Sequence, residues 1–173
     1  MASRQDQFTA LVQAYGAELY RIAYWLCKTD SARAEDLVQE TFVRAWKSLE
    51  SLLDDRKARG WLITILRREF YRDYARNKNR PELRDDHYSE QLVDPAQFST
   101  SDSIGLQRAL QSLPDNYREP LLLQVLGGYS CDEIASLMEL KPGAVMTRLF
   151  RARQAIKKLL GDDGIVQSES MGK

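Results

Sequence analysis

Residues that carry metal or nucleophilic chemistry are scarce in this 173-residue sequence. It contains two cysteines, Cys27 and Cys131, and one histidine, His87, and none of them has the spacing of a metal-binding motif. Cys27 lies in an apolar helical run and is predicted to be buried. The sequence also has no nucleophile motif and no phosphate-binding glycine loop. We therefore predict no enzyme and expect no catalytic residue, metal or cofactor.

Long apolar runs are missing as well. No run approaches the length needed to span a membrane, and the first residues lack the basic-then-apolar pattern of a signal sequence. The expected location is the reducing cytoplasm, without membrane insertion.

The sequence has no net charge, since 25 basic residues balance 25 acidic ones. The charges are nevertheless segregated along the chain. Residues 1–80 carry 15 basic and 11 acidic residues, and residues 104–161 carry eight and five. Residues 81–103 carry one basic and six acidic residues, and residues 162–173 carry one and three. This pattern predicts two basic domains, an acidic flexible linker between them and a disordered tail.

Apolar residues recur at helical spacing in both domains, so the predicted fold class is all-α. The first domain is expected to contain helices over residues 8–27, with a possible break near Gly16, then from 30 or 31 to about 49, and from about 59 to 77. The second domain is expected to begin with a helix over 104–113. The next helix opens at Pro114-Asp115, carries Leu121, Leu122, Val125 and Leu126, and stops at the glycines 127 and 128.

Residues 128–160 have the features of a helix-turn-helix. Ser130 and Glu133 form a capping box, residues 139–141 form a turn, and Pro142 suits a first helical position. The second helix has an apolar stripe: Val145, Leu149, Ala152, Ile156 and Leu159. Its opposite face carries Gly143, Thr147, Phe150, Arg151, Gln154 and Lys158, with Met146 at the edge and Arg148 and Arg153 flanking the stripe. Six basic residues and no acidic one lie between residues 141 and 158. Insertion of this helix into a DNA major groove is favoured over a helical hairpin with a solvated basic face, because the basic bias and the turn chemistry agree.

The two long helices of the first domain after Asp30 carry opposite charges on their outward faces. The earlier one is predicted to pack through Leu37, Val38, Thr41, Phe42, Ala45 and Leu49, and to expose Asp36, Gln39, Glu40, Val43 and Lys47, with Trp46 at the margin. The later one is predicted to pack through Leu62, Ile65, Leu66 and Phe70, and to expose Trp61, Thr64, Arg67, Arg68, Tyr71 and Arg72. Glu69 and Asp73 fall on its inward side, where ion pairs or hydrogen bonds are expected, with partners that the sequence does not identify.

Two interpretations stay open for each of these faces. The acidic face is either solvated or a docking surface for a basic partner, because an exposed valine and a tryptophan lie among the acids. The basic face is either solvated or a surface for single-stranded nucleic acid, whose phosphates pair with cations and whose bases stack on aromatic rings.

Five segments resemble, in order and spacing, the motifs of extracytoplasmic-function (ECF) sigma factors, the small promoter-recognition subunits of bacterial RNA polymerase. Residues 36–46 (DLVQETFVRAW) resemble the family signature D-x-x-Q-E-x-F-x-x-x-(W/Y). Residues 60–65 (GWLITI) resemble the W-L-x-x-I-A run, although Leu66 stands in place of the alanine, and residues 113–118 (LPDNYR) resemble the L-P-x-x-x-R run. Residues 128–135 and 143–153 resemble the helix-turn-helix, although Glu139 stands in place of the usual turn glycine.

The resemblance implies partners and site residues. The partners would be core RNA polymerase, promoter DNA and an anti-sigma factor. The polymerase-binding residues would be Asp36, Gln39, Glu40, Val43 and Trp46. Residues at the minus-ten element, where the loop before the third helix captures a flipped base, would be Arg56, Lys57, Arg59, Trp61, Arg67, Arg68, Tyr71 and Arg72. Residues at the minus-thirty-five element would be Gly143, Met146, Thr147, Arg148, Phe150, Arg151 and Arg153. The competing hypothesis is a dimeric helix-turn-helix regulator, which leaves residues 36–46 without a role.

Overall fold

The computed structural model describes residues 2–78 and 101–164, and all regular elements in these ranges are helical. The chain forms two compact domains. The first contains α1 (Arg4–Leu26), α2 (Ser31–Lys47), the 3-10 turns η1 (Leu49–Ser51) and η2 (Asp55–Lys57), and α3 (Ala58–Lys78). The second contains α4 (Ser101–Ser112), α5 (Asp115–Val125), α6 (Cys131–Met138) and α7 (Pro142–Gly164). The predicted all-α fold is confirmed.

Two predicted segment boundaries differ from the structure. Helix α4 begins at Ser101, inside the segment predicted as linker, and α7 continues to Gly164, inside the segment predicted as tail. The remainder of the predicted linker and tail, residues 81–100 and 165–173, lies outside the described residues.

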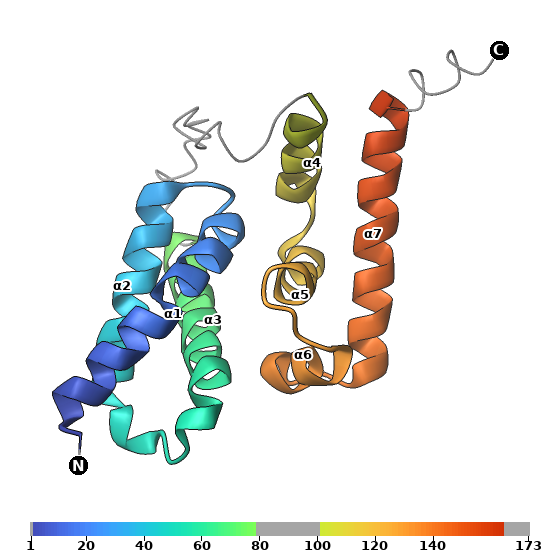
Figure 1. Ribbon diagram of the computed structural model, residues 1–173. Coiled ribbons are helices and arrows are strands. Elements are labelled where there is room, and N and C mark those ends of the chain that lie inside the picture. Colours follow the sequence, from blue (N-terminus) through green and yellow to red (C-terminus); the bar gives the residue numbers. More distant parts are fainter. Residues whose placement is uncertain (1, 79–100, 165–173) are drawn as a thin grey trace. The chain divides into compact units, whose positions relative to one another are not determined.

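The first domain is a three-helix unit in which α1, α2 and α3 run up, down and up (Figure 1) and each packs on the other two. Its most deeply buried side chains are Leu19, Ile22, Leu26, Leu62, Ile63 and Leu66. Cys27 is buried as predicted. The prediction placed Ile65 inward, but Ile63 is 1% exposed and Ile65 is half-buried. The buried stripe of α3 is therefore wider than a single row of every third or fourth residue.

Helix α1 begins earlier than predicted and is not broken at Gly16. The Ser3 hydroxyl accepts a hydrogen bond from the Asp6 amide (3.1 Å), and the Asp6 carboxylate accepts one from the Ser3 amide (3.0 Å). This reciprocal capping box satisfies two of the free amides at the helix start. Hydrogen bonds from the Ser3 side chain and backbone lower the pKa of Asp6 below its usual value. The structure thus starts the helix at a cap that the periodicity of apolar residues did not reveal.

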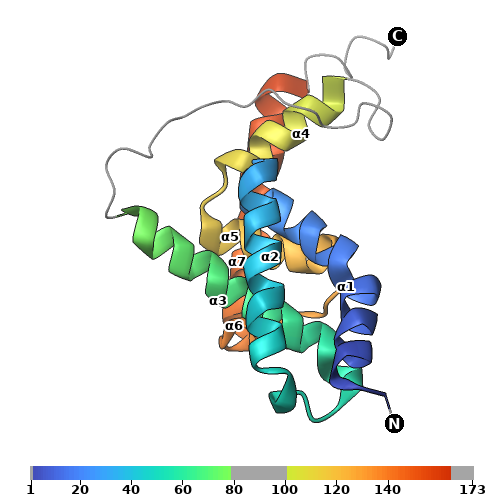
Figure 2. The same cartoon turned by 90° about the vertical axis from the view of Figure 1, so that its left-hand side faces the viewer.

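In the second domain α7 runs alongside α4 and α5, as the two views in Figures 1 and 2 show. The core comes from Leu121, Leu122, Leu123, Ile134, Val145 and Leu149. Val125 is 68% exposed, although it shares a helix with the buried leucines. None of the helices in the described ranges is long and apolar enough to cross a membrane.

The corner between α4 and α5 is held by a buried arginine. Arg118 is 1% exposed, donates a hydrogen bond to the Leu113 carbonyl (2.8 Å) and binds the Asp115 carboxylate. A carbonyl at a helix end needs such a donor when it is removed from water. Arg118, the arginine of the L-P-x-x-x-R run, therefore stabilises the connection between α4 and α5.

The predicted helix-turn-helix is confirmed in its local chemistry. The Ser130 amide donates to the Glu133 carboxylate (2.8 Å), and the Glu133 amide donates to the Ser130 hydroxyl (3.2 Å). The turn passes through Glu139, whose φ of 55° is in the left-handed region that glycine adopts without a steric penalty. Pro142 is the first residue of α7. The turn thus has a backbone conformation that favours glycine, with a glutamate in that position.

Replacing Arg118 with alanine should lower the stability of the second domain by about 2–3 kcal/mol, because the Leu113 carbonyl would lose its buried donor. All three tryptophans of the chain lie in the first domain. Urea unfolding followed by circular dichroism should therefore shift, while the transition in tryptophan fluorescence should not. Arg108→Ala, a change on the exposed side of α4, is the matched control and should shift neither signal. Equal circular-dichroism midpoints for Arg118→Ala and wild type would contradict this role.

Candidate functional site

The outward face of α2 lies where the sequence places it. Asp36, Gln39 and Glu40 are exposed, and Val43 has 44% of its surface exposed. The opposite side of the helix supplies the buried residues Ala34, Leu37, Thr41 and Ala45. Packing within the domain therefore does not account for an apolar Val43 among the acidic and amide side chains.

Trp46 contributes to this face only in part, since other side chains cover much of the indole. The Arg4 guanidinium carbon lies 4.7 Å from the ring centroid, and the Phe8 ring packs edge-on with centroids 5.2 Å apart. Arg4 also donates a hydrogen bond to the Trp46 carbonyl (2.7 Å). With 39% of its surface exposed, Trp46 both fastens α1 to α2 and borders the α2 face.

The basic residues of η2 and of the start of α3 differ in how far ion pairs within the domain neutralise their charges. The Arg56 side chain is 90% exposed and pairs with Asp54 at 3.1 Å. Hydrogen bonds from the Arg56 side chain and amide lower the pKa of the Asp54 carboxyl. Arg59 is half-buried and donates to the Glu18 carboxylate (2.9 Å). Its guanidinium is therefore partly neutralised within the domain, whereas Arg56 and the exposed Lys57 face solvent.

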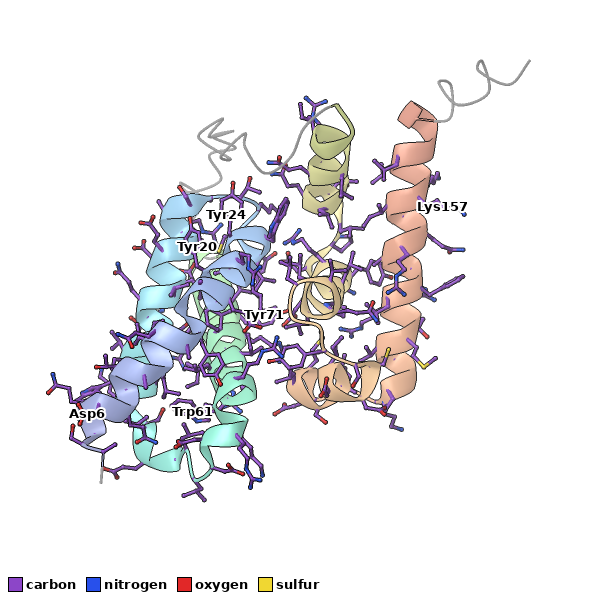
Figure 3. The ribbon with its side chains drawn as sticks, in the orientation of Figure 1. Asp6, Tyr20, Tyr24, Trp61, Tyr71 and Lys157 are labelled. Atoms are coloured by element: carbon purple, nitrogen blue, oxygen red, sulfur yellow. The ribbon has the colours of Figure 1, made fainter. Side chains whose placement is uncertain are left out.

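The prediction that Trp61 faces outward is wrong. Trp61 is half-buried and packs on the apolar cluster of Leu11, Leu49, Leu52 and Ala58. Its indole N–H donates to the Ser51 hydroxyl (3.2 Å), so it holds the η1 turn against α3. Figure 3 shows Trp61 at the start of α3, beside the connection from α2, and Tyr71 farther along the same helix. The two aromatic side chains do not form one stacking surface.

Farther along α3, the predicted outward residues are at the surface. Arg68, Tyr71 and Arg72 are exposed and Arg67 is half-buried, with its guanidinium carbon 5.8 Å from the Tyr71 ring centroid. Among the described residues Arg68 has no ion-pair partner, whereas Arg72 donates to the Glu69 carboxylate (2.8 Å). This stretch therefore presents cations beside an aromatic ring, the arrangement that suits single-stranded nucleic acid.

Glu69 is the residue whose role the sequence indicated least. Its carboxylate is buried and lies between Arg44 of α2 (3.3 Å) and Arg72 of α3 (2.8 Å). Arg44 in turn contacts Glu40 on the α2 face at 3.2 Å. The four side chains Glu40, Arg44, Glu69 and Arg72 form a continuous series of ion pairs from one predicted face to the other. The sequence indicated an ion pair at Glu69 but not its partners, because they come from two helices.

Asp73 was also predicted to lie inward, and that placement is wrong. Its side chain is 52% exposed and pairs with Arg33 of α2 at 3.3 Å. The expected ion pair is therefore present, but at the surface.

Helix α7 separates into the two predicted faces. Val145, Leu149 and Ala152 are buried, whereas Ile156 is half-buried and Leu159 is 43% exposed. The opposite face exposes Gly143, Met146, Thr147, Phe150 and Arg151. Of the two flanking arginines, Arg148 is half-buried and Arg153 is exposed and donates to the Gln124 side chain. The described part of the chain contains no group of three or more His, Cys, Asp or Glu residues placed to hold a metal ion.

Comparison with known families matches both domains. Residues 11–80 match the family model for sigma-70 region 2, and residues 104–156 match the model for sigma-70 region 4.

Curated relatives agree with these matches. The chain is 35% identical over 133 residues to the ECF RNA polymerase sigma factor EcfG of Rhodopseudomonas palustris, covering 76% of this chain and 74% of the relative. It is 33% identical over 153 residues to SigM of Bacillus subtilis, another ECF RNA polymerase sigma factor, covering 86% and 92%.

Two solved structures share the arrangement of helices. The sigma factor RpoE of Bartonella quintana, in complex with the anti-sigma factor NepR, matches with a TM-score of 0.76 and 29% identity, covering 88% of this chain and 96% of RpoE. CnrH, in complex with the cytosolic domain of CnrY, matches with a TM-score of 0.66 and 29% identity, covering 91% and 89%.

Replacing Glu69 with alanine should lower the stability of the first domain by about 1–2 kcal/mol, because Arg44 and Arg72 would lose their shared counter-ion. Both arginines are partly exposed, so water would solvate them and the loss should stay below that of a fully buried pair. Tryptophan fluorescence during urea unfolding measures the effect. Glu40→Ala removes the exposed partner of the same Arg44 and should cost less than about 0.5 kcal/mol. Equal losses for the two variants would show that burial of Glu69 is not what matters.

Proposed function

Because this chain belongs to the ECF sigma factors of RNA polymerase, we propose that its two domains divide promoter recognition between them. A sigma factor directs RNA polymerase to promoters, binds both the enzyme and DNA, and catalyses no reaction itself. The division assigns polymerase binding and the minus-ten element to residues 1–80, and the minus-thirty-five element to residues 104–161.

The polymerase-binding surface in this proposal is the outward face of α2. The observation that carries it is the exposure of Asp36, Gln39, Glu40 and Val43 on the side of the helix that packing leaves unused. An apolar side chain ringed by polar and acidic ones suits the centre of a protein interface with a basic partner. Trp46 would border this contact with the part of its ring that Arg4 and Phe8 leave uncovered.

The minus-ten element would lie along α3 and the connection before it. Arg56, Lys57 and Arg68 supply exposed cations for the phosphates, and Tyr71 supplies a ring on which a base can stack. Arg67 and Arg72 would add charge from the same helix. Trp61 and Arg59 would act from behind this surface, through the Ser51 and Glu18 contacts that hold the η1 turn and α3 in place.

The minus-thirty-five element would be read by α7 in the major groove, since that helix follows the capped α6 and the turn at Glu139. Arg151, exposed and without an ion-pair partner among the described residues, can donate two hydrogen bonds to a guanine. Arg148 and Arg153 flank the packed side and would contact phosphates, which add affinity without sequence information.

An anti-sigma factor is proposed as a further partner, because both solved relatives described above were determined in complex with another protein and RpoE's partner is an anti-sigma factor. The cytoplasm, where RNA polymerase acts, is the proposed location.

Reversing the charge of Asp36 with Asp36→Arg should weaken binding to core RNA polymerase about tenfold or more, because the new cation would face a basic partner. The side chain is exposed and has no ion pair in the described residues, so circular dichroism and the unfolding midpoint should not change. Glu35→Arg changes the same charge on a neighbouring side of α2 and is the matched control. Affinity that falls equally for both variants would point to a general charge effect instead of this face.

Replacing Arg68 with alanine should reduce promoter opening more than polymerase binding. Arg68 is exposed on α3, away from the α2 face, and loses no ion pair when truncated. Permanganate reactivity of thymines in the melted strand should fall several-fold at equal holoenzyme concentration. Arg76→Ala, an exposed change two turns later on α3, is the control. Unchanged reactivity for Arg68→Ala would remove this residue from the minus-ten surface.

A further inference from the structure

The exposed face of α7 carries two large apolar side chains among its basic and polar ones. Met146 and Phe150 each have 60% of their surface exposed, and they lie one helical turn apart on the same side. The ring contacts of the described residues do not include Phe150, and the buried core of the domain is supplied by the opposite stripe. Packing within the domain therefore does not account for either side chain.

Thr147, one helical turn before Phe150, adds a methyl group to the same face. Its hydroxyl donates a hydrogen bond back to the Gly143 carbonyl (3.0 Å). With its proton committed to the backbone, the hydroxyl is not a free donor to a base, and the side chain offers its methyl group and one oxygen acceptor. This part of the α7 face thus presents the thioether of Met146, the phenyl ring of Phe150 and the methyl group of Thr147, beside the guanidinium of Arg151.

Apolar groups can distinguish bases in the major groove by one feature only. The edges of the four base pairs present hydrogen-bond donors, acceptors and a single apolar group, the C5-methyl of thymine. A surface of Met146, Thr147 and Phe150 would bury that methyl group, which adenine, guanine and cytosine lack.

We propose that Met146, Thr147 and Phe150 select thymine in the minus-thirty-five element through its C5-methyl group, next to a guanine bound by Arg151. This inference rests on the proposed function and adds to it the chemical feature that is read. Burial of one methyl-sized apolar group corresponds to about a fourfold preference per thymine.

The test uses the full chain with core RNA polymerase and duplex promoters whose minus-thirty-five element is randomised. Two libraries are synthesised, one with thymine and one with deoxyuridine, which differ only in the C5-methyl group. Bound duplexes from the first should be enriched in thymine at one or more positions, and bound duplexes from the second should lose that preference. Replacing one selected dT with dU should then weaken binding about fourfold. Replacing the same dT with dC should also weaken binding, and 5-methyl-dC at that position should recover part of this loss.

Variants assign the effect to the three side chains. Met146→Ala and Phe150→Ala should bind the dT and dU duplexes more nearly equally. Thr147→Ser removes the methyl group but keeps the hydroxyl and should lose discrimination, whereas Thr147→Val keeps a methyl group and should retain it. Lys157→Ala is the control on α7, because this exposed side chain lies farther along the helix than the three proposed residues (Figure 3). It should leave the dT-to-dU ratio unchanged.

The outcomes separate this inference from the proposed function. Enrichment of an upstream sequence with equal binding of dT and dU duplexes would overturn the thymine assignment alone. Failure to enrich any upstream sequence would overturn both. Loss of polymerase binding in Phe150→Ala, with the base preference intact, would show that this face contacts a protein and would also overturn the assignment.

Discussion

The main constraint on this molecule is that a helix in a small bundle can bury only one stripe of its surface. In α2, α3 and α7 that stripe packs in the core, as Ala34, Leu62 and Val145 illustrate with 0% exposure. The remaining face of each helix is free of packing requirements. The three faces differ in chemistry: acidic with an exposed valine on α2, basic with a tyrosine on α3, and basic with an exposed methionine and phenylalanine on α7. What distinguishes the three proposed interfaces is therefore the side chains on rather similar scaffolds.

The parts of the fold that sequence predicts well are those set by neighbours along one helix. The two faces of α2 and α7 follow from apolar spacing, and the start of α6 follows from Ser130 and Glu133, three residues apart. The predictions that were wrong concern side chains whose contacts come from other helices or turns. Trp61 turns toward Leu11 and Ser51, which come from α1 and η1, and Asp73 turns outward to Arg33 of α2. No periodicity within α3 contains that information.

The same distinction applies to the candidate site. Sequence identifies which side chains carry charge or aromatic rings, but not which charges are already neutralised. The sequence does not distinguish Arg59 and Arg72 from Arg68. In the structure, however, Arg59 pairs with Glu18 and Arg72 pairs with Glu69. A cation with an internal partner must weaken that pair before it can bind a phosphate fully, whereas Arg68 need not. The described geometry thus ranks residues that composition treats as equivalent.

Glu69 gives this ranking a further consequence, because its two arginines belong to different proposed surfaces. Arg44 divides its contacts between Glu40 on the α2 face and the buried Glu69, which also holds Arg72 on the α3 face. A basic partner that attracts Glu40 would leave Arg44 with Glu69 as its remaining counter-ion. Glu69 would then be shared less with Arg72, whose charge would become more available to DNA. Electrostatic attraction between neighbouring charges at about 3 Å is strong enough in a partly buried setting for such redistribution to matter. If the α2 and α3 faces have the roles proposed above, these four side chains would couple polymerase binding to minus-ten binding within one three-helix domain, without a change of fold.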